Sequence, residues 1–276
     1  MLVSSVVLAF KMLPRTPFVF LTLLLLPAAQ PLILSRRAAL EISLTFASTI
    51  SDSSSSTSAT SQQPAYDGYA STYDLLDDKV ASSLSFLGLS QGRSDLLSNS
   101  YGSVLEICAG TGINLPYYPK RKLKSLTMLD ISPNMLKLAE ERKESYPCEN
   151  VKFDIADITD GRAVIGRYGE GAFDTIVDTF SLCVLDTETV RTLELVRRLI
   201  KPDGKILLFE NARADNSFVG AYQDLTAQAI AKKGGGKGCV FNQRVDELVK
   251  EAGLTILDRN DYAGGLFRAY VCGRGG

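Results

Sequence analysis

Two glycines and two carboxylates form the pattern in this sequence that is best suited to binding a charged ligand. Gly110 and Gly112 lie in a run of small residues that follows the apolar segment 104–107. A glycine turn lets the backbone approach a ligand closely, because no side chain intervenes. Asp130 follows about 20 residues later, after a second apolar segment, where doubly wound folds hold ribose hydroxyls. The pattern therefore predicts a site for a nucleoside-bearing cofactor.

The residues around these glycines do not favour a dinucleotide cofactor. A dinucleotide site needs a third glycine, which packs the helix against the strand and leaves room for a pyrophosphate at the helix N-terminus. Leu115 takes that place, and Pro116 follows it. Glu106, shortly before the turn, would repel a pyrophosphate but suits a cationic ligand. The simpler alternative is an ordinary turn between a strand and a helix, with Asp130 at the start of the next helix.

Residues 103–114, S-V-L-E-I-C-A-G-T-G-I-N, resemble motif I of the class I S-adenosylmethionine (SAM) methyltransferases, with Cys108 in place of the usual first glycine. Residues 129–136, L-D-I-S-P-N-M-L, resemble the segment that follows motif I in that family. The resemblance implies that Glu106 lies near the methionine end of SAM. The cofactor-binding residues that it implies are Tyr73, Glu106, Cys108, Ala109, Gly110, Gly112, Asp130, Ile131, Met135, Asp157, Ile158 and Thr179.

Three further segments extend the resemblance. Residues 66–74 resemble the Y-D-x-x-A-x-x-Y-D opening of the ubiquinone/menaquinone-type ("type 11") methyltransferases, in which a tyrosine-bearing helix closes over SAM. Residues 112–119 belong to a G-T-G-x-N-x-x-x-Y-P form that resembles membrane-associated small-molecule methyltransferases. In the family, the aspartate at the position of Asp157 lies at the adenine amino group. The alternative for Asp157 is a structural role in capping a turn.

Composition excludes several classes of function. The formal net charge of −1 argues against a sequence-independent hold on nucleic acid phosphates. There is no histidine, so Ser-His-Asp and Cys-His triads and imidazole metal sites are absent. The five cysteines never have C-x-x-C spacing, which argues against a zinc site or a disulfide framework. We therefore expect no metal.

The first 63 residues differ from the rest and are expected to form a separate targeting segment and linker. Residues 16–35 are uncharged and long enough to cross a bilayer, but Pro27 and Pro31 interrupt them. Residues 35–40 resemble part of an organelle-targeting peptide, which implies a plastid or mitochondrion, and residues 51–63 read as a disordered Ser/Thr-rich linker. The alternative is an N-terminal membrane anchor that is retained.

Residues 64–276 are expected to form one domain that positions these side chains. The resemblance implies an α/β fold: a Rossmann-like, doubly wound, seven-stranded sheet with a C-terminal antiparallel hairpin. Apolar runs and turn residues predict the following elements. Strands are expected at 104–107, 126–129, 151–155, 173–179 and 205–210, a turn at 201–204, helices beginning at Ser132 and Asp186 and covering 218–230 and 242–253, and a hairpin from 254–258 and 266–272.

The expected chemistry is an in-line transfer of the SAM methyl group to a small, hydrophobic acceptor of the quinone, lipid or thiol type. Apolar residues 180–185 and the amphipathic segment 218–230 favour such an acceptor, although an apolar stripe like that of 218–230 is more often part of the core than of a substrate site. Holding the reactants in line can contribute about 7–11 kcal/mol, so the chain needs no histidine base. If a base is required, the candidates are Tyr69, Tyr73, Asp186 and Glu210. An acceptor that is already ionised, such as a thiolate, would need none.

Two other functions remain open from the sequence. An NAD(P)-dependent oxidoreductase would use the same kind of glycine turn, but Leu115 and Glu106 argue against it. A non-catalytic SAM-binding scaffold at an organelle membrane would keep the glycines and carboxylates but would not catalyse methyl transfer. The oligomeric state and the methylated atom are not predicted.

Overall fold

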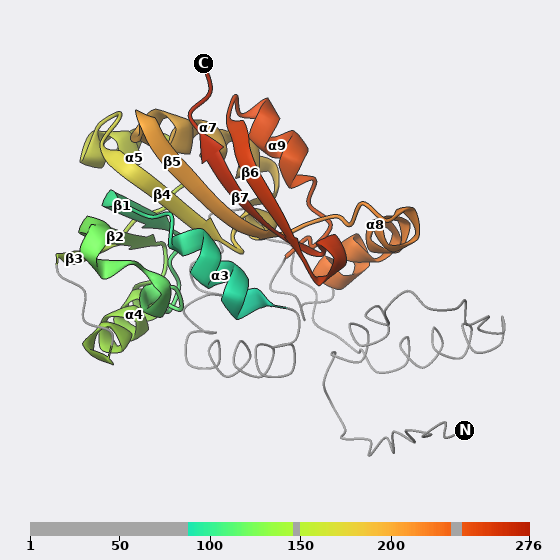
Figure 1. Cartoon of the computed structure of the whole chain (residues 1–276), viewed down its shortest axis with the longest axis horizontal. Helices are drawn as coiled ribbons and strands as arrows, with labels where there is room; N and C mark the ends of the chain where they lie inside the picture. The colour runs from blue at the N-terminus through green and yellow to red at the C-terminus, as the bar shows by residue number, and fades with distance from the viewer. Residues whose placement is uncertain (1–87, 146–149, 233–238) are drawn as a thin grey trace, which may run out of the picture. The chain divides into compact units, whose positions relative to one another are not determined.

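The structure, a computed structural model, describes residues 88–145, 150–232 and 239–276, which form one sheet with helices on both faces (Figure 1). The strand order is β3-β2-β1-β4-β5-β7-β6. The first five strands pair in parallel, whereas β7 is antiparallel to both of its neighbours. The fold class predicted from the sequence is confirmed. The strands are β1 (Gly102–Ile107), β2 (Leu123–Asp130), β3 (Val151–Ile155), β4 (Phe173–Thr179), β5 (Ile200–Asn211), β6 (Thr255–Tyr262) and β7 (Phe267–Gly273).

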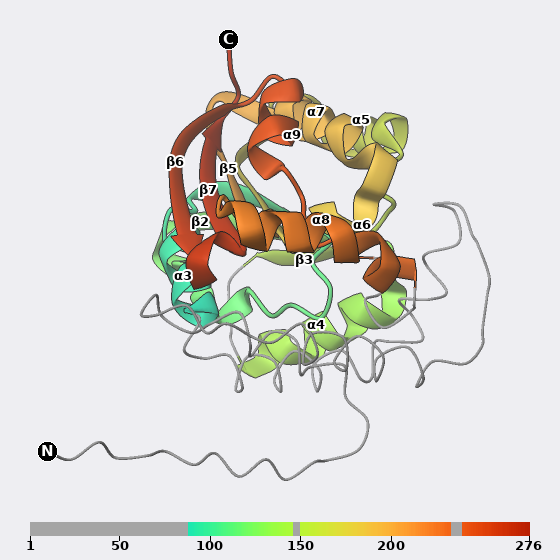
Figure 2. The same ribbon diagram turned by 90° about the vertical axis from the view of Figure 1, so that its right-hand side faces the viewer.

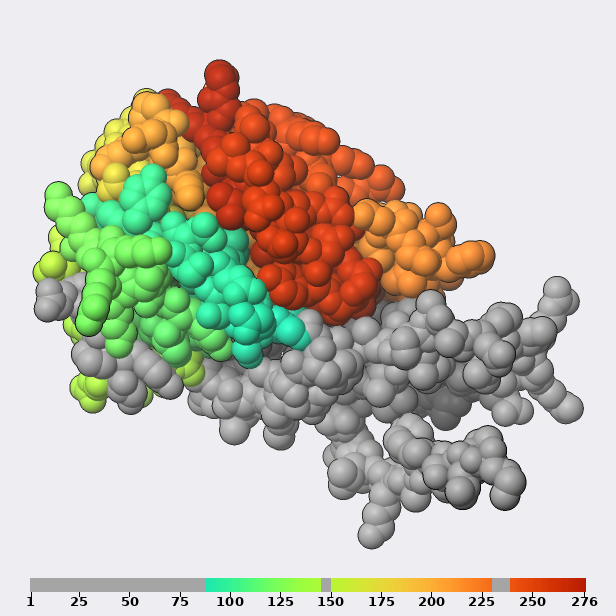
Figure 3. All heavy atoms as spheres, viewed as in Figure 1, coloured from blue at the N-terminus to red at the C-terminus, as the bar shows by residue number. Residues whose placement is uncertain are grey.

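Helices cover both faces of this sheet. The helices α3 (Leu89–Leu97) and α4 (Pro133–Ser145) pack on one face, and α5 (Gly161–Tyr168), α7 (Thr189–Leu199) and α9 (Val245–Glu251) pack on the other. Figure 2 shows the sheet between α4 on one side and α5, α7 and α9 on the other. On the outer surface seen in Figure 3, α3 lies beside the β6–β7 hairpin. The sheet is therefore buried on both faces, as its apolar strands require.

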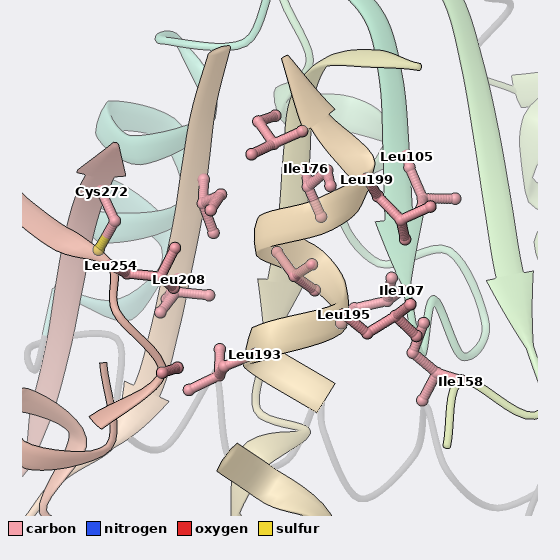
Figure 4. Packing of buried hydrophobic residues seen from close by; sticks show 14 of the residues in the cluster. Leu105, Ile107, Ile158, Ile176, Leu193, Leu195, Leu199, Leu208, Leu254 and Cys272 are labelled. Carbon is pink, nitrogen blue, oxygen red and sulfur yellow. The ribbon is translucent and has the colours of Figure 1, made fainter. Parts of the chain in front are cut away.

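Strand alternation divides the core into two layers. In β1, Leu105 and Ile107 pack against the α7 side, and Val104 packs against the α3 side. Figure 4 shows Leu195 and Leu199 of α7 beside these two β1 side chains. Because successive side chains of a strand point to opposite faces, Glu106 faces the α3 side with Val104. The position of each polar residue on the two faces follows from this alternation.

The strand order also fixes where a ligand can bind. From β1 the chain proceeds to β2 and β3 in one direction, and β4 and β5 lie in the other direction. The change of direction falls between β1 and β4, and open α/β sheets bind ligands at the carboxyl ends of the strands at such a point. We call this edge, where β1, β2, β4 and β5 end, the carboxyl edge. The predicted glycine turn lies on it.

The helix after β2 begins as the sequence predicts. Pro133 is its first residue, and the Ser132 hydroxyl accepts a hydrogen bond from the Met135 N–H at 3.2 Å. Such an N-cap satisfies one of the free N–H groups of the first turn. Proline is well tolerated at this first position because its missing N–H is not needed there. The local signals at 132–133 were therefore sufficient to place the helix.

Two elements differ from the prediction. The predicted turn at 201–204 lies within β5, which pairs with β4 first through Ile200 and again from Lys205, so the intervening residues bulge out of the register. The helix expected from Asp186 begins with a 3₁₀ turn (Asp186–Glu188) and becomes the α-helix α7 only at Thr189, and a short helix that was not predicted, α6 (Leu182–Leu185), precedes it. Asp186 has a positive φ of 48°, which interrupts a regular helix at this residue.

The helix α8 (Ser217–Lys232) confirms the expected element but corrects the prediction about its apolar stripe. Phe218 and Leu225 are 89% and 80% exposed, so they do not belong to the core. The side chains that α8 buries are instead Gln223 and Ala227. Gln223 is held by two backbone groups, donating to the Ala212 carbonyl at 3.0 Å and accepting from the Ala214 N–H at 2.8 Å. Periodicity identified the helix but not which of its faces is covered.

Several predictions fall outside the residues that the structure describes. These are the targeting segment and linker in residues 1–63, the tyrosine-bearing segment 66–74, and most of the glycine-rich segment 232–238. Within the part of the chain that the structure does describe, none of the helices has both the length and the hydrophobicity needed to cross a bilayer.

Candidate cofactor site

The glycine turn forms an open loop directly after β1. Cys108, Gly110 and Gly112 all have positive φ values, of 49°, 55° and 76°. A Cβ atom added to Gly110 would have no atom within 4 Å, whereas one on Gly112 would lie 3.0 Å from Ala139 and from Leu115. Gly110 thus borders open space, and Gly112 is required for close packing of α4. The two glycines serve different purposes, ligand access and helix packing.

Asp130 holds this loop in place from the end of β2. Its Oδ2 accepts a hydrogen bond from the Gly110 N–H at 2.8 Å, and its Oδ1 accepts one from the Ser132 N–H at 2.9 Å. The side chain is buried. A carboxylate has about four lone-pair positions, and the contact of Asp130 with ribose hydroxyls remains a prediction. Asp130 therefore combines the structural role that the sequence left open with a position beside the predicted ligand.

Glu106 lies beneath the loop as a buried carboxylate. It is 2% exposed and accepts hydrogen bonds from Asn114 Nδ2 at 2.9 Å and from the Tyr118 hydroxyl at 2.8 Å. Burial raises its pKa to about 7, and the two hydrogen bonds and nearby Arg93 partly oppose this rise. A positive ligand would favour the ionised form. The geometry therefore matches the cationic ligand predicted from the sequence.

Arg93 in α3 belongs to the same cluster and was not predicted. Its Nη1 donates to Asn114 Oδ1 at 2.5 Å and to Thr179 Oγ1 at 3.3 Å, and its guanidinium lies 5.0 Å from the centre of the Phe180 ring. These contacts join α3 to the chain just after the glycine loop and to the end of β4. Arg93 is the one basic residue in residues 89–97, but nothing in its spacing links it to the glycine turn. Its role becomes visible only when α3 is placed on the sheet.

The predicted adenine side contains residues with clear structural roles. Asp157 Oδ1 accepts hydrogen bonds from the Thr159 N–H at 2.8 Å and from the Thr159 hydroxyl at 2.7 Å, so Asp157 caps a turn. Ile158 and Met135 are buried, and Ile131 is half-buried. Asp157, Ile131 and Met135 lie next to the ends of β3 and β2. Their contacts with a cofactor remain predictions.

A second polar cluster lies on the opposite face of the carboxyl edge. Asp178 at the end of β4 and Glu210 near the end of β5 are both 0% exposed. Glu210 Oε1 accepts a hydrogen bond from the Ser181 N–H at 3.2 Å. Burial raises the pKa of both carboxyls, and each lies in the electrostatic field of another buried acid. Cys108 also lies here, and burial and Asp178 raise the pKa of its thiol.

The four candidate bases have different positions. Glu210 lies at the carboxyl edge, in the second cluster, whereas Asp186 is exposed at the start of the 3₁₀ turn after α6. Tyr69 and Tyr73 lie outside the described residues, so the predicted contact of Tyr73 with SAM also stays a prediction. Asp178 was not among the candidates. The structure brings Glu210, but not Asp186, close to the glycine loop through Cys108.

The chain following the loop excludes the pyrophosphate cradle of a dinucleotide site. The loop leads into a three-residue 3₁₀ turn (Leu115–Tyr117), and Leu115 is buried. A pyrophosphate requires the N-terminus of an α-helix at this place. With Glu106 beneath the loop as well, the geometry disfavours the NAD(P) alternative.

Several known proteins are similar to this chain in sequence or in fold. A family model described as a methyltransferase domain matches residues 104–204, which contain the loop, Asp130 and Asp178. The protein "Methyltransferase OMS1, mitochondrial" of Saccharomyces cerevisiae is 29% identical over 184 residues, which are 63% of this chain and 38% of that protein. Phosphatidylethanolamine N-methyltransferase of Cereibacter sphaeroides is 26% identical over 167 residues, 60% of this chain and 77% of that protein.

A solved structure described as a complex of DhpI with SAM and HEP has the same fold, with a TM-score of 0.57 and 20% identity over 79% of this chain and 99% of that chain. The chain therefore carries a methyltransferase domain in residues 104–204 and is similar in sequence and fold to SAM-dependent methyltransferases of class I. The predicted family, cofactor and enzyme class are confirmed. The match covers 38% of the yeast protein. The acceptor and partners of this methyltransferase therefore do not follow from that relative.

The residues at the carboxyl edge of this methyltransferase fit SAM. The open space at Gly110 is a cradle that a side chain would fill. Glu106 can hold the amino group of the cofactor, and Arg93, whose two hydrogen bonds involve only Nη1, can hold a carboxylate with its other N–H groups. Asp130 is placed to accept hydrogen bonds from ribose hydroxyls. The site thus offers a carboxylate and a guanidinium to the two charged groups of the methionine part of SAM, and a hydrogen-bond acceptor to its ribose.

Proposed function

We propose that this methyltransferase transfers the methyl group of SAM to a small, hydrophobic acceptor of the quinone, lipid or thiol type, at or near an organelle membrane. SAM supplies an activated methyl group on a positively charged sulfur. The residues described above hold the cofactor at the carboxyl edge, so the acceptor must approach from the segments that follow β4 and β5. Placing the acceptor in line with the methyl group is the main contribution that the chain can make, about 7–11 kcal/mol for well-oriented reactants.

The observation that carries the acceptor class is the exposed apolar face of α8. This helix follows β5, and Phe218 and Leu225 are seven residues apart, so they lie on the same side of the helix. Large apolar side chains that are exposed together mark interaction sites more often than isolated ones do. In Figure 2, α8 crosses in front of the carboxyl edge beside α6. A lipophilic acceptor or the lipid surface that carries it fits this face.

The segment after β4 supports the same acceptor class in part. Leu182 is fully buried in the core, whereas Phe180, Val184 and Leu185 are half-buried. The partly exposed members of this segment can line an apolar approach to the carboxyl edge. Among the relatives, one is named as a phosphatidylethanolamine methyltransferase and one as a mitochondrial methyltransferase. These names favour a lipid acceptor and a mitochondrial location over the plastid alternative.

The experiment measures S-adenosylhomocysteine release with SAM and a panel of acceptors: a quinol, phosphatidylethanolamine in vesicles, a hydrophobic thiol, a protein and an RNA. We expect turnover with at least one of the first three and none with the last two. Turnover on protein or RNA alone would overturn the acceptor class. No turnover on any acceptor, with intact SAM binding, would favour the non-catalytic scaffold.

Variants of α8 test where the acceptor approaches. Leu225→Ser should lower turnover of a vesicle-borne acceptor while leaving SAM affinity and thermal stability unchanged, because Leu225 is exposed. Leu257→Ser is the matched control, since Leu257 is 60% exposed on β6. Tyr222→Ala, at a half-buried position of α8, should raise the Michaelis constant for the acceptor if the helix covers the site. A loss of melting temperature without a change in kinetics would show that Tyr222 is only structural.

A further inference from the structure

The buried carboxyls of Asp178 and Glu210 have no structural explanation. Both oxygens of Asp178 and Oε2 of Glu210 are buried and have no hydrogen-bond partner among the residues that the structure describes. Burying a carboxyl without partners is costly, and two such groups in one core cost more than a pair of apolar residues of the same size. Within the described ranges no group of three potential metal ligands is arranged around them. The pair therefore needs another reason to be there.

The two carboxyls act on each other across adjacent strands. β4 and β5 are hydrogen-bonded neighbours, and Asp178 raises the pKa of Glu210. Two anions in one buried site repel each other, so such a pair holds a proton at pH values where a single carboxyl is ionised. The pair thus has a charge that can change near neutral pH. Its charge must respond to whatever charged ligand binds nearby.

The titratable groups that act on the pair are mostly acidic. Glu106 of β1 raises the pKa of Asp178, and Cys183 of α6 raises that of Glu210. The Ser181 hydroxyl and the backbone N–H groups of Thr179, Ser181 and Leu182 lie close enough to oppose this rise in pKa. Of these groups, only the Ser181 N–H has the geometry of a hydrogen bond, which it donates to Glu210 Oε1 at 3.2 Å. Cys183 itself lies beside Cys239. Asp130 of β2 raises the pKa of the Cys108 thiol, which lies next to the pair. A cation at this edge would relieve the surplus of acidic groups.

The pair lies beside the cofactor loop. Cys108 is the first residue of the glycine turn. Asp178 and Glu210 raise the pKa of its thiol, and the Ser181 hydroxyl lowers it. Glu106 and the pair lie on opposite faces of the same strand ends, because Glu106 shares a face with Val104 and Asp178 shares one with Ile176. SAM and S-adenosylhomocysteine carry the same amino and carboxylate groups. They differ in charge only at sulfur, which is positive in SAM and neutral in its product.

We propose that Asp178 and Glu210 form a charge-sensing pair that gives up a proton to solvent when the positively charged sulfur of SAM binds, and that favours SAM over S-adenosylhomocysteine. The proton balance is simple: the pair with one proton and free SAM become the ionised pair with bound SAM and one proton in solution. After methyl transfer the sulfur is neutral, so this attraction is lost and the product is held less tightly. The proposal depends on the cofactor and not on which acceptor is used.

The test is isothermal titration calorimetry of the full chain at pH 7 with SAM and, separately, with S-adenosylhomocysteine. Each titration is repeated in two buffers with different ionisation enthalpies, which gives the number of protons released. Proton release linked to Glu106 is common to both ligands, because both carry the amino group. The difference between the two ligands therefore isolates the response to the charge on sulfur. We expect more protons to be released with SAM than with S-adenosylhomocysteine.

Two amide substitutions locate the effect. Asp178→Asn and Glu210→Gln should each lower the ratio of SAM affinity to S-adenosylhomocysteine affinity by at least about tenfold, as expected for unit charges within about 12 Å of each other at an effective dielectric constant of about 20. The difference in proton release should shrink in the same variants. Glu194→Gln, on the exposed side of α7, is the matched control and should behave as the wild type.

The outcomes separate this proposal from a folding defect and from the acceptor assignment. A variant that still binds S-adenosylhomocysteine as tightly as the wild type is folded, so its loss of SAM affinity is specific. If both ligands release equal numbers of protons in the wild type, the pair does not sense charge. The same conclusion follows if the difference persists in both Asp178→Asn and Glu210→Gln. Neither result depends on methyl transfer, so a wrong acceptor class leaves this test unaffected.

Discussion

Removing the Asp130 carboxylate should affect both the stability of the domain and its hold on the cofactor. In Asp130→Ala, the N–H groups of Gly110 and Ser132 lose acceptors that lie 2.8 Å and 2.9 Å away. A hydrogen bond to a charged group contributes about 1.5–3 kcal/mol. Because Asp130 is at the end of its strand, where water can replace part of the loss, we expect the free energy of unfolding to fall by about 2–4 kcal/mol.

The same substitution should weaken SAM binding by about 10- to 100-fold, the equivalent of one charged hydrogen bond. The ribose contact is lost directly, and the Gly110 loop loses its anchor. Asp130→Asn keeps the size of the side chain and one acceptor oxygen, so it can serve only one of the two N–H groups. Its losses of stability and affinity should both fall between those of the wild type and Asp130→Ala.

The assays are urea unfolding followed by circular dichroism and calorimetry with SAM. The control is Asp258→Ala, which removes an exposed acceptor of the Asn260 side chain on β6. Asp130→Ala that is as stable as this control would show that the two hydrogen bonds contribute nothing. A folded Asp130→Ala with unchanged SAM affinity would reduce Asp130 to a helix-start residue.

Three other changes test separate parts of the account. Gly110→Ala and Gly112→Ala should both cost some stability, because both glycines have a positive φ. Gly112→Ala should lower the melting temperature further, because its Cβ would lie 3.0 Å from Ala139 and Leu115, whereas a side chain at Gly110 enters open space and should mainly weaken SAM binding, with Gly110→Val more severe than Gly110→Ala. A larger loss of stability in Gly110→Ala than in Gly112→Ala would contradict the assignment. Burial raises the folded-state pKa of Glu106 from 4.5 to about 7, so its contribution to apo-protein stability is full below pH 4.5 and is lost as the pH rises through 7. Urea unfolding at pH 5 and pH 8 should therefore show a smaller loss of stability at pH 8 in Glu106→Gln than in the wild type, and equal losses would refute the raised pKa. A chain that begins at Pro64 should fold and bind SAM as the full chain does, and aggregation or weaker binding would show that residues 1–63 contribute to the domain.

The sequence was sufficient for the features that depend on neighbouring residues. The apolar runs at 104–107 and 173–179 became strands, and Ser132 with Pro133 began α4, because these signals act within one turn or one strand. The closing hairpin was also predictable, although β6 continues to Tyr262, beyond the expected end at 258. Its extra residues pair with β7 and hence depend on a partner that the local pattern does not contain.

The features that sequence reasoning missed depend on residues that are distant along the chain. Arg93 reaches the site because α3 packs beside η4 (Leu115–Tyr117), and its own segment carries no motif. Asp178 meets Glu210 because β4 pairs with β5. The exposed face of α8 was missed for a related reason. A helical period shows that Phe218 and Leu225 share a side, but it does not show which side of the helix the domain covers.

The most direct test of the central claim is calorimetry of the wild-type chain with SAM, S-adenosylhomocysteine and NAD. The cradle at Gly110, with Glu106 beneath it and no helix N-terminus for a pyrophosphate, predicts binding of the first two ligands and no heat from NAD. Binding of NAD at micromolar affinity, with no heat from SAM or S-adenosylhomocysteine, would contradict the account.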